Sequence, residues 1–333
     1  MFKDIKQVMK DSVLYGIGNV AVKLVGFILI PLYTDAEYFS TADYGLMGLL
    51  EVTSQILIAV MGLSLYSGLI RWYWDAEYRD KQKTIFFTTL LFTILTSLCI
   101  GSVLWLNVGE LSALLVQQEG YSLGGELPYI LQLLILTSML GAVVEVPQNL
   151  LRLQRKPIYY SLTNIVRLFA TLVLTIYFTI SLHRGVSGVY EAQLVGIVIQ
   201  LLMVLPLVIK NSSCRVDRKC TIQLLAYSYP LVFPAIVGSL LTVFDRYIIN
   251  HFQGLDDVGF YSLGYKVGNT LKVFIVTSVQ LALTPLLMKK MNDPDNKRFY
   301  SKVLTYFSFG LMFCALGLNL FSREGIVWVT TNP

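Results

Sequence analysis

Charged residues are scarce in this chain. Asp, Glu, Lys and Arg make up 14% of its 333 residues, whereas apolar residues make up 55% and the mean hydropathy is +0.63. A soluble domain carries about 25% charged residues, so this chain cannot cover a water-facing surface of the usual kind. The composition excludes an ordinary soluble protein and predicts an integral membrane protein whose apolar faces contact lipid.

Cysteine and histidine are also scarce, with four and two copies. No CxxC pair occurs, and Cys214 and Cys220 share a basic loop that we place in the cytosol, which disfavours both disulfides and a metal site. The sequence also lacks a nucleophile elbow, an HExxH motif and a P-loop. It therefore predicts no catalytic residue, no metal, no cofactor and no ATP hydrolysis by the chain itself.

Long apolar runs take the place of the missing charge. A spanning helix needs ~20 mostly apolar residues, and backbone in hydrocarbon must satisfy its own hydrogen bonds, so each run is predicted to be a helix. The sequence thus predicts an all-α polytopic integral membrane protein with about nine spans. The predicted spans are residues 13–33, 45–70, 84–106, 127–151, 158–182, 187–209, 222–249, 259–288 and 303–321.

Basic residues alternate between the connections that join these spans. Of the 26 Lys and Arg residues, nineteen lie at one set of span ends, two at the other set and five inside spans. Lys and Arg accumulate on the cytoplasmic side of membrane proteins, so we expect a cytoplasmic N-terminus and place residue 333 outside. Because the basic residues form no single patch, the net charge of +5 does not indicate a nucleic-acid partner.

A weak internal repeat links the two halves of the chain. Residues Phe39–Leu46 resemble Phe252–Phe260, and each copy is an acidic turn that opens a span. Copies that lie six spans apart predict two bundles of equal orientation, a layout found in transporter folds. We expect a six-helix bundle over residues 1–210 and a partial second bundle over residues 211–333. Three spans cannot match six, so we expect the second bundle to be incomplete and the chain to be truncated.

Several charged residues lie inside the predicted spans. A charge near the middle of a bilayer costs at least ~2.5–3.5 kcal/mol, so it is retained where it meets a partner or a wet cavity. We interpret five cations as the lining of a central cavity that suits a phosphate or pyrophosphate headgroup, and two acids as ion-coupling or gating groups. The cations are Lys23, Arg167, Arg246, Lys266 and Lys272, and the acids are Glu51 and Asp245.

The alternative is a set of structural ion pairs. Lys23 or Lys266 would then pair with Glu51, and Arg167 would pair with Glu145. However, Glu51 and Lys266 occupy equivalent positions of the repeat to within one residue. Equivalent positions in two halves face each other across a shared axis, and this placement favours a lined axis.

Short motifs in both halves resemble those of one transporter family. They are Leu14–Asn19, Lys23–Phe27, Pro31–Tyr33, Asp43–Gly45, Phe244–Ile249, Val258–Ser262, and Pro285 followed by Lys289 and Lys290. With them the chain resembles the polysaccharide transporters of the multidrug/oligosaccharidyl-lipid/polysaccharide exporter superfamily, the flippases of O-antigen type. The resemblance is clearest over the first, second, seventh and eighth predicted spans.

The resemblance implies an inverted-V transporter of two bundles that opens alternately to each side of the inner (cytoplasmic) membrane. It implies a polyprenyl-pyrophosphate-linked oligosaccharide as cargo, contact with membrane lipid, and coupling to the membrane potential or to a gradient of Na⁺ or H⁺. The chain would then be a secondary transporter and not an enzyme. Two alternatives stay open. A multidrug or cation antiporter of the same superfamily would need an acidic cavity. A membrane-embedded saccharide polymerase or ligase would need a larger outer domain.

Removal of deep positive charge tests the cationic cavity. We expect alanine at Lys23, Arg167 or Lys272 in the full-length protein, and at all three in a triple variant, to abolish translocation of the lipid-linked saccharide, because the headgroup loses counter-charges. Expression, measured by immunoblot of membranes, should not change. Translocation by the triple variant at the wild-type rate would contradict the hypothesis.

Overall fold

Every regular element that the structure describes is a helix. The structure is a computed structural model that describes residues 28–115, 125–213, 215–276, 279 and 296–330. Its elements are α2 Ile30–Tyr33, α3 Thr41–Gly62, α4 Leu65–Trp72, η1 Ala76–Lys81, α5 Gln82–Leu106, α6 Val108–Leu115, α7 Leu127–Leu153, α8 Pro157–Ile176, η2 Tyr177–Ser181, α9 Gly185–Asn211, α10 Arg218–Phe252, α11 Leu255–Leu271, η3 Lys272–Val276, α13 Asn296–Leu320 and α14 Ser322–Val329.

Seven of these helices, counted within the described residues, are long and apolar enough to cross a membrane. They correspond to seven of the nine predicted spans and confirm an all-α polytopic membrane protein. Most of the first predicted span, residues 13–33, lies outside the described residues. The eighth, residues 259–288, is described as α11 and η3 but not beyond residue 279.

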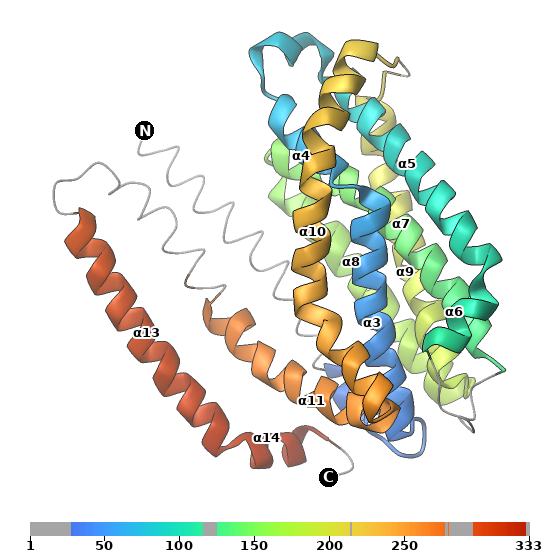
Figure 1. Cartoon of the computed structure of the whole chain (residues 1–333), viewed down its shortest axis with the longest axis vertical. Helices are drawn as coiled ribbons and strands as arrows, with labels where there is room; N and C mark the ends of the chain where they lie inside the picture. Colours follow the sequence, from blue (N-terminus) through green and yellow to red (C-terminus); the bar gives the residue numbers. More distant parts are fainter. Residues whose placement is uncertain (1–27, 116–124, 214, 277–278, 280–295, 331–333) are drawn as a thin grey trace.

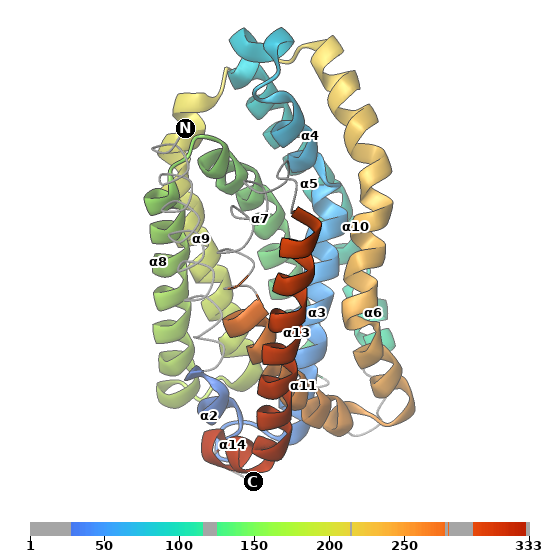
Figure 2. The same ribbon diagram turned by 90° about the vertical axis from the view of Figure 1, so that its left-hand side faces the viewer.

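The connections between spans fall at two opposite ends of the molecule (Figure 1). We call the end with residues 34–40 and 253–254 the acidic end, and the end with residues 73–81 and 212–217 the basic end. The most buried spans, α3 and α7, lie inside the bundle, whereas α13 stands apart from α3 to α10 (Figures 1 and 2). Exposed apolar side chains such as Phe313, 72% exposed, therefore form a surface suited to lipid.

Glycine allows α3 and α11 to cross in close contact. A Cβ atom on Gly45 would lie 1.9 Å from the carbonyl oxygen of Leu255, and one on Gly259 would lie 2.6 Å from that of Thr41. Small residues at a helix crossing let the two backbones approach. Gly45 and Gly259 are also equivalent positions of the internal repeat, so the two copies pack on each other. The division into bundles at residue 210 stays a prediction.

The second predicted span, residues 45–70, is not one continuous helix. Leu63 and Ser64 adopt left-handed backbone conformations, with φ of 44° and 51°, and they separate α3 from α4. Residues other than glycine seldom adopt such angles without support. Thr96 of α5 donates to the carbonyl of Met61 at 2.8 Å, and Ser64 donates to the carbonyl of Leu231 on α10 at 3.4 Å. Neighbouring helices thus stabilise a break that hydropathy could not reveal.

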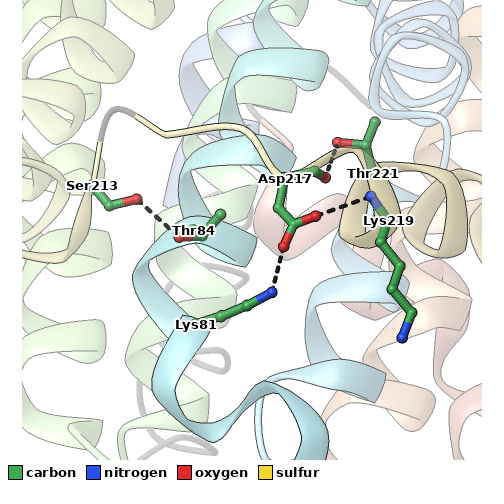
Figure 3. Close-up of polar contacts among 6 residues, drawn as sticks. All are labelled: Lys81, Thr84, Ser213, Asp217, Lys219 and Thr221. Atoms are coloured by element: carbon green, nitrogen blue, oxygen red, sulfur yellow. Dashed lines mark hydrogen bonds and ion pairs between the residues drawn. The ribbon is translucent and has the colours of Figure 1, made fainter.

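Polar contacts fix the segment between α9 and α10 at the basic end (Figure 3). Nζ of Lys81 lies 2.5 Å from Oδ2 of Asp217, and the hydroxyls of Thr84 and Ser213 lie 3.2 Å apart. Asp217 also caps α10, because its Oδ1 accepts from the backbone N–H of Lys219 at 3.0 Å. The hydrogen bond from Lys81 holds the pKa of the Asp217 carboxyl below its ordinary value.

Substitution of Gly45 tests the close crossing. We expect Gly45→Ala to cost about 1–3 kcal/mol of stability, because the new methyl group must displace the carbonyl of Leu255. The measurement is the midpoint of thermal unfolding of the purified protein in detergent. Gly264→Ala on α11 is the matched control, since a Cβ there meets nothing within 4 Å. Equal midpoints for the two variants would refute the crossing.

Candidate functional site

Three cavities follow α3 from the acidic end of the molecule to the break after Gly62. The acidic-end cavity has a volume of about 700 Å³, the middle cavity about 220 Å³ and the basic-end cavity about 390 Å³. Tyr33 and Tyr44 line both the acidic-end and the middle cavity, and Gln55 lines both the middle and the basic-end cavity. Because α3 rises roughly 32 Å, the series extends over about the ~30 Å thickness of a hydrocarbon core.

Two oppositely charged side chains line the middle cavity. Nζ of Lys266 lies 5.0 Å from the ring centroid of Tyr44 and 5.9 Å from that of Tyr33, within the range of cation–π contacts. Glu51 lines the same cavity, together with the amide side chains of Gln55 and Gln193 and with other residues. In the described part of the chain, Lys266 and Glu51 form no ion pair.

Aromatic rings and oxygen atoms together line the acidic-end cavity. Its aromatic residues are Tyr33, Tyr38, Phe39, Tyr44 and Phe260. Its lining also includes the carboxylate of Glu37 and the hydroxyls of Ser40 and Thr41. Such a surface suits a ligand that combines apolar faces with hydrogen-bonding groups at their edges.

The structure places two further predicted cations outside these three cavities. Nη1 of Arg167 donates to Oε1 of Gln200 at 3.0 Å, and Nε2 of Gln200 donates to Oδ1 of Asn164 at 2.9 Å, so a polar chain joins α8 to α9. Lys272 is exposed at the start of η3. Lys23 lies outside the described residues. A common cavity for all the predicted cations stays a prediction.

Asp245 and Arg246 lie where α10 meets α3 and α11. Arg246 is 5% exposed, donates from Nη1 to the carbonyl of Gly48 at 3.3 Å and places its guanidinium 4.9 Å from the ring centroid of Tyr265. Asp245 accepts a hydrogen bond from the hydroxyl of Tyr261. Arg246 thus connects α10 to α3 and α11. The sequence alone could not show whether this residue bridges helices or lines a cavity.

Glu145 is a site residue that the sequence analysis treated only as a pairing partner. It lies on α7 and lines the basic-end cavity with Gln55, Ser64 and Ser239, among other residues. The predicted pair with Arg167 does not form, since Arg167 bonds to Gln200. The sequence signal was an acid inside a span, but the carboxylate faces Gly62, where α3 ends, and hydropathy does not reveal that helix end.

Comparison with known proteins fits this architecture. The sequence profile of the polysaccharide biosynthesis protein family matches residues 8–291. The chain belongs to this family. A comparison with curated proteins finds no significant match to the chain.

Several solved structures that are similar to this chain are described as transporters. An inward-facing multidrug-resistance MATE transporter of the MOP superfamily has a TM-score of 0.69 and 15% identity over 96% of this chain and 72% of its own. VcmN of Vibrio cholerae, solved as a mutant, has a TM-score of 0.68 and 16% identity over 98% and 76%. A Pyrococcus furiosus transporter of the MOP superfamily has a TM-score of 0.66 and 16% identity over 98% and 74%. At these identities the matches show the fold.

A charge-conserving substitution tests the bridging role of Arg246. We expect Arg246→Lys to lower the thermal unfolding midpoint, at a cost of about 1–2 kcal/mol, because an ammonium cannot both stack flat on Tyr265 and reach the carbonyl of Gly48. Arg323→Lys, at an exposed position of α14, is the control. An unchanged midpoint for Arg246→Lys would show that the planar guanidinium is not needed.

Proposed function

We propose that this chain acts as a flippase, which moves a polyprenyl-pyrophosphate-linked oligosaccharide across the cytoplasmic membrane by alternating access. The observation that carries the proposal is the position of Lys266. Its ammonium lies against the rings of Tyr33 and Tyr44, in a cavity that continues into the larger acidic-end cavity. This arrangement supports one site for an anionic group beside a second site for a bulkier polar group.

The middle cavity suits the pyrophosphate. The ammonium of Lys266 has three N–H donors, and hydrogen bonds from an ammonium to phosphate oxygens are stronger than those between neutral groups. No carboxylate neutralises it by an ion pair in the described residues, so its charge can be directed at a ligand. We propose that Lys23, Arg167, Arg246 and Lys272 add positive potential around this site and that Glu51 and Asp245 serve ion coupling or gating.

The acidic-end cavity suits the saccharide. A sugar ring has apolar C–H faces, which pack on aromatic rings, and hydroxyls at its rim, which donate to carboxylates. Tyr38 and Phe260 provide aromatic surface there, and Glu37 provides an acceptor. A volume of about 700 Å³ falls within the range of sites for small ligands, so it can take part of an oligosaccharide.

We infer the direction of insertion from charge. The basic end holds the Lys- and Arg-rich connections, so it would face the cytoplasm, with the N-terminus on the same side. We propose that residues 1–210 and 211–333 belong to two bundles that move against each other, with energy from the membrane potential or from a gradient of Na⁺ or H⁺. Membrane lipid would accommodate the polyprenyl tail.

A multidrug or cation antiporter is the second candidate, and the shared fold favours it. One similar structure is described as that of a MATE multidrug transporter. Another, from Pyrococcus furiosus, is described as having a binding pocket of reverse polarity that suggests a different function. The ammonium of Lys266 favours an anionic cargo over a cationic one in this chain.

Loss of the Lys266 charge tests the flippase. We expect Lys266→Gln to reduce translocation of polyprenyl-pyrophosphate-linked saccharide into proteoliposomes by about tenfold or more, because the pyrophosphate loses a charged donor. Lys302→Gln, an exposed position of α13, should keep the wild-type rate. Wild-type translocation by Lys266→Gln would overturn the role of the middle cavity.

A further inference from the structure

The basic-end cavity lies beside the end of a broken helix. The last four carbonyls of a helix have no partner within it, and they give this end a partial negative charge. In α3 these carbonyls belong to residues 59–62. The carbonyl of Val60 accepts from the N–H of Leu63, and that of Met61 accepts from Thr96. The other two residues of the turn, Ala59 and Gly62, both line the cavity.

The carboxylate of Glu145 faces this same helix end. A Cβ atom built on Gly62 would lie 3.9 Å from Oε2 of Glu145, so the carboxylate sits against the last turn of α3. A negative side chain at the C-terminal end of a helix is unfavourable, because both carry negative charge. The arrangement therefore favours a positive charge between them.

Among the described residues, this positive charge comes only from a distance: Arg152 attracts Glu145 without forming an ion pair with it. No Lys, Arg or His occurs among the described residues that line the cavity. The nearest basic residue on the same helix, two turns along, is Arg152, whose guanidinium lies 4.7 Å from the ring centroid of Tyr160 and donates to its hydroxyl. Arg152 forms no ion pair with Glu145 in the described part of the chain.

Oxygen-bearing side chains from three helices and from the break line part of the same space. Gln55 comes from α3, Ser64 from the break, Glu145 from α7 and Ser239 from α10. The hydroxyls of Ser64 and Ser239 each donate to a backbone carbonyl, which leaves their lone pairs for a cation. Carboxylate, hydroxyl, amide and carbonyl oxygens are the ligands that hard cations prefer.

From these contacts we propose that the basic-end cavity is a Na⁺ site, with Glu145 as its charged ligand and Ser64, Ser239, Gln55 and the last turn of α3 as neutral ligands. A single carboxylate matches a monovalent ion, and no cluster of three Asp, Glu, His or Cys side chains suited to a multivalent metal occurs among the described residues. A volume of about 390 Å³ exceeds that of one ion, so Na⁺ would keep part of its water shell. The proposal does not depend on which cargo the protein carries.

The test measures Na⁺ binding by the purified full-length chain in detergent. Radioactive Na⁺ binding and the thermal unfolding midpoint are recorded in NaCl and in N-methyl-D-glucamine chloride of equal ionic strength. The wild type should bind Na⁺, and its midpoint should rise with Na⁺ concentration, because a ligand of the folded state stabilises it by mass action. Equal midpoints in the two salts together with no Na⁺ binding would overturn the proposal.

Matched variants locate the site. Glu145→Gln keeps the shape of the side chain and should weaken Na⁺ binding by about tenfold or more, because it removes the charged ligand. Ser239→Ala, a milder change, should weaken it less. Glu110→Gln on α6, an exposed acid at the acidic end, should bind Na⁺ as the wild type does.

Three outcomes would contradict the proposal, and they differ from a failure of the flippase hypothesis. Wild-type Na⁺ affinity in Glu145→Gln would place the ion elsewhere. Equal weakening in Glu110→Gln would indicate a general charge effect. A midpoint that responds to pH but not to Na⁺ would indicate a proton in place of Na⁺. None of these measurements involves cargo, whereas loss of cargo transport in Lys266→Gln involves no Na⁺ binding.

Discussion

Inside a bilayer, a backbone N–H or C=O group has no water to bond and must find its partner within the protein. Long helices such as α7 and α9 meet this requirement by themselves. The break at Leu63 and Ser64 does not, because it ends one helix and starts another in the middle of a predicted span. It is tolerated because Thr96 donates to the carbonyl of Met61 and Ser64 donates to the carbonyl of Leu231 on α10, and the basic-end cavity lies beside it. The irregular backbone therefore depends on hydrogen bonds that join it to α5 and α10.

The crossing of α3 and α11 explains where the middle cavity lies. Gly45 and Gly259 bring the two backbones together near the acidic end, and α11 then diverges from α3 (Figure 1). Glu51 lies six residues beyond Gly45 and Lys266 seven beyond Gly259, so both are about 10 Å past the contact. At that distance the helices have separated enough to leave a space, and the long side chains extend into it. The small residues thus set where the two helices cross, and the charged residues lie where the helices have separated.

Much of the architecture could be predicted from the sequence, because lipid imposes a simple rule on span length. Seven spans follow from hydropathy, and the similarity of Phe39–Leu46 to Phe252–Phe260 indicated equivalent positions, although the close packing of the two copies came only from the structure. The candidate site was less predictable. Depth in a span could not separate Arg246, which bridges helices, from Lys266, which lines a cavity, because the difference lies in what each side chain faces. The break after Gly62 was missed since Leu63 and Ser64 have no turn signature in sequence.

The middle and basic-end cavities are close enough for charges in them to interact. Glu51 in the middle cavity and Gly62 at the basic-end cavity are eleven residues apart on α3, which is roughly 16 Å of helix rise. At an effective dielectric constant of about 20, unit charges at that distance interact by ~1 kcal/mol, or about fivefold in affinity. A Na⁺ ion beside Glu145 would neutralise that carboxylate and so remove its repulsion of an anionic headgroup at Lys266. The coupling between the two sites is reciprocal, so a bound headgroup would also favour Na⁺ binding. This electrostatic part of the coupling needs no movement of α3.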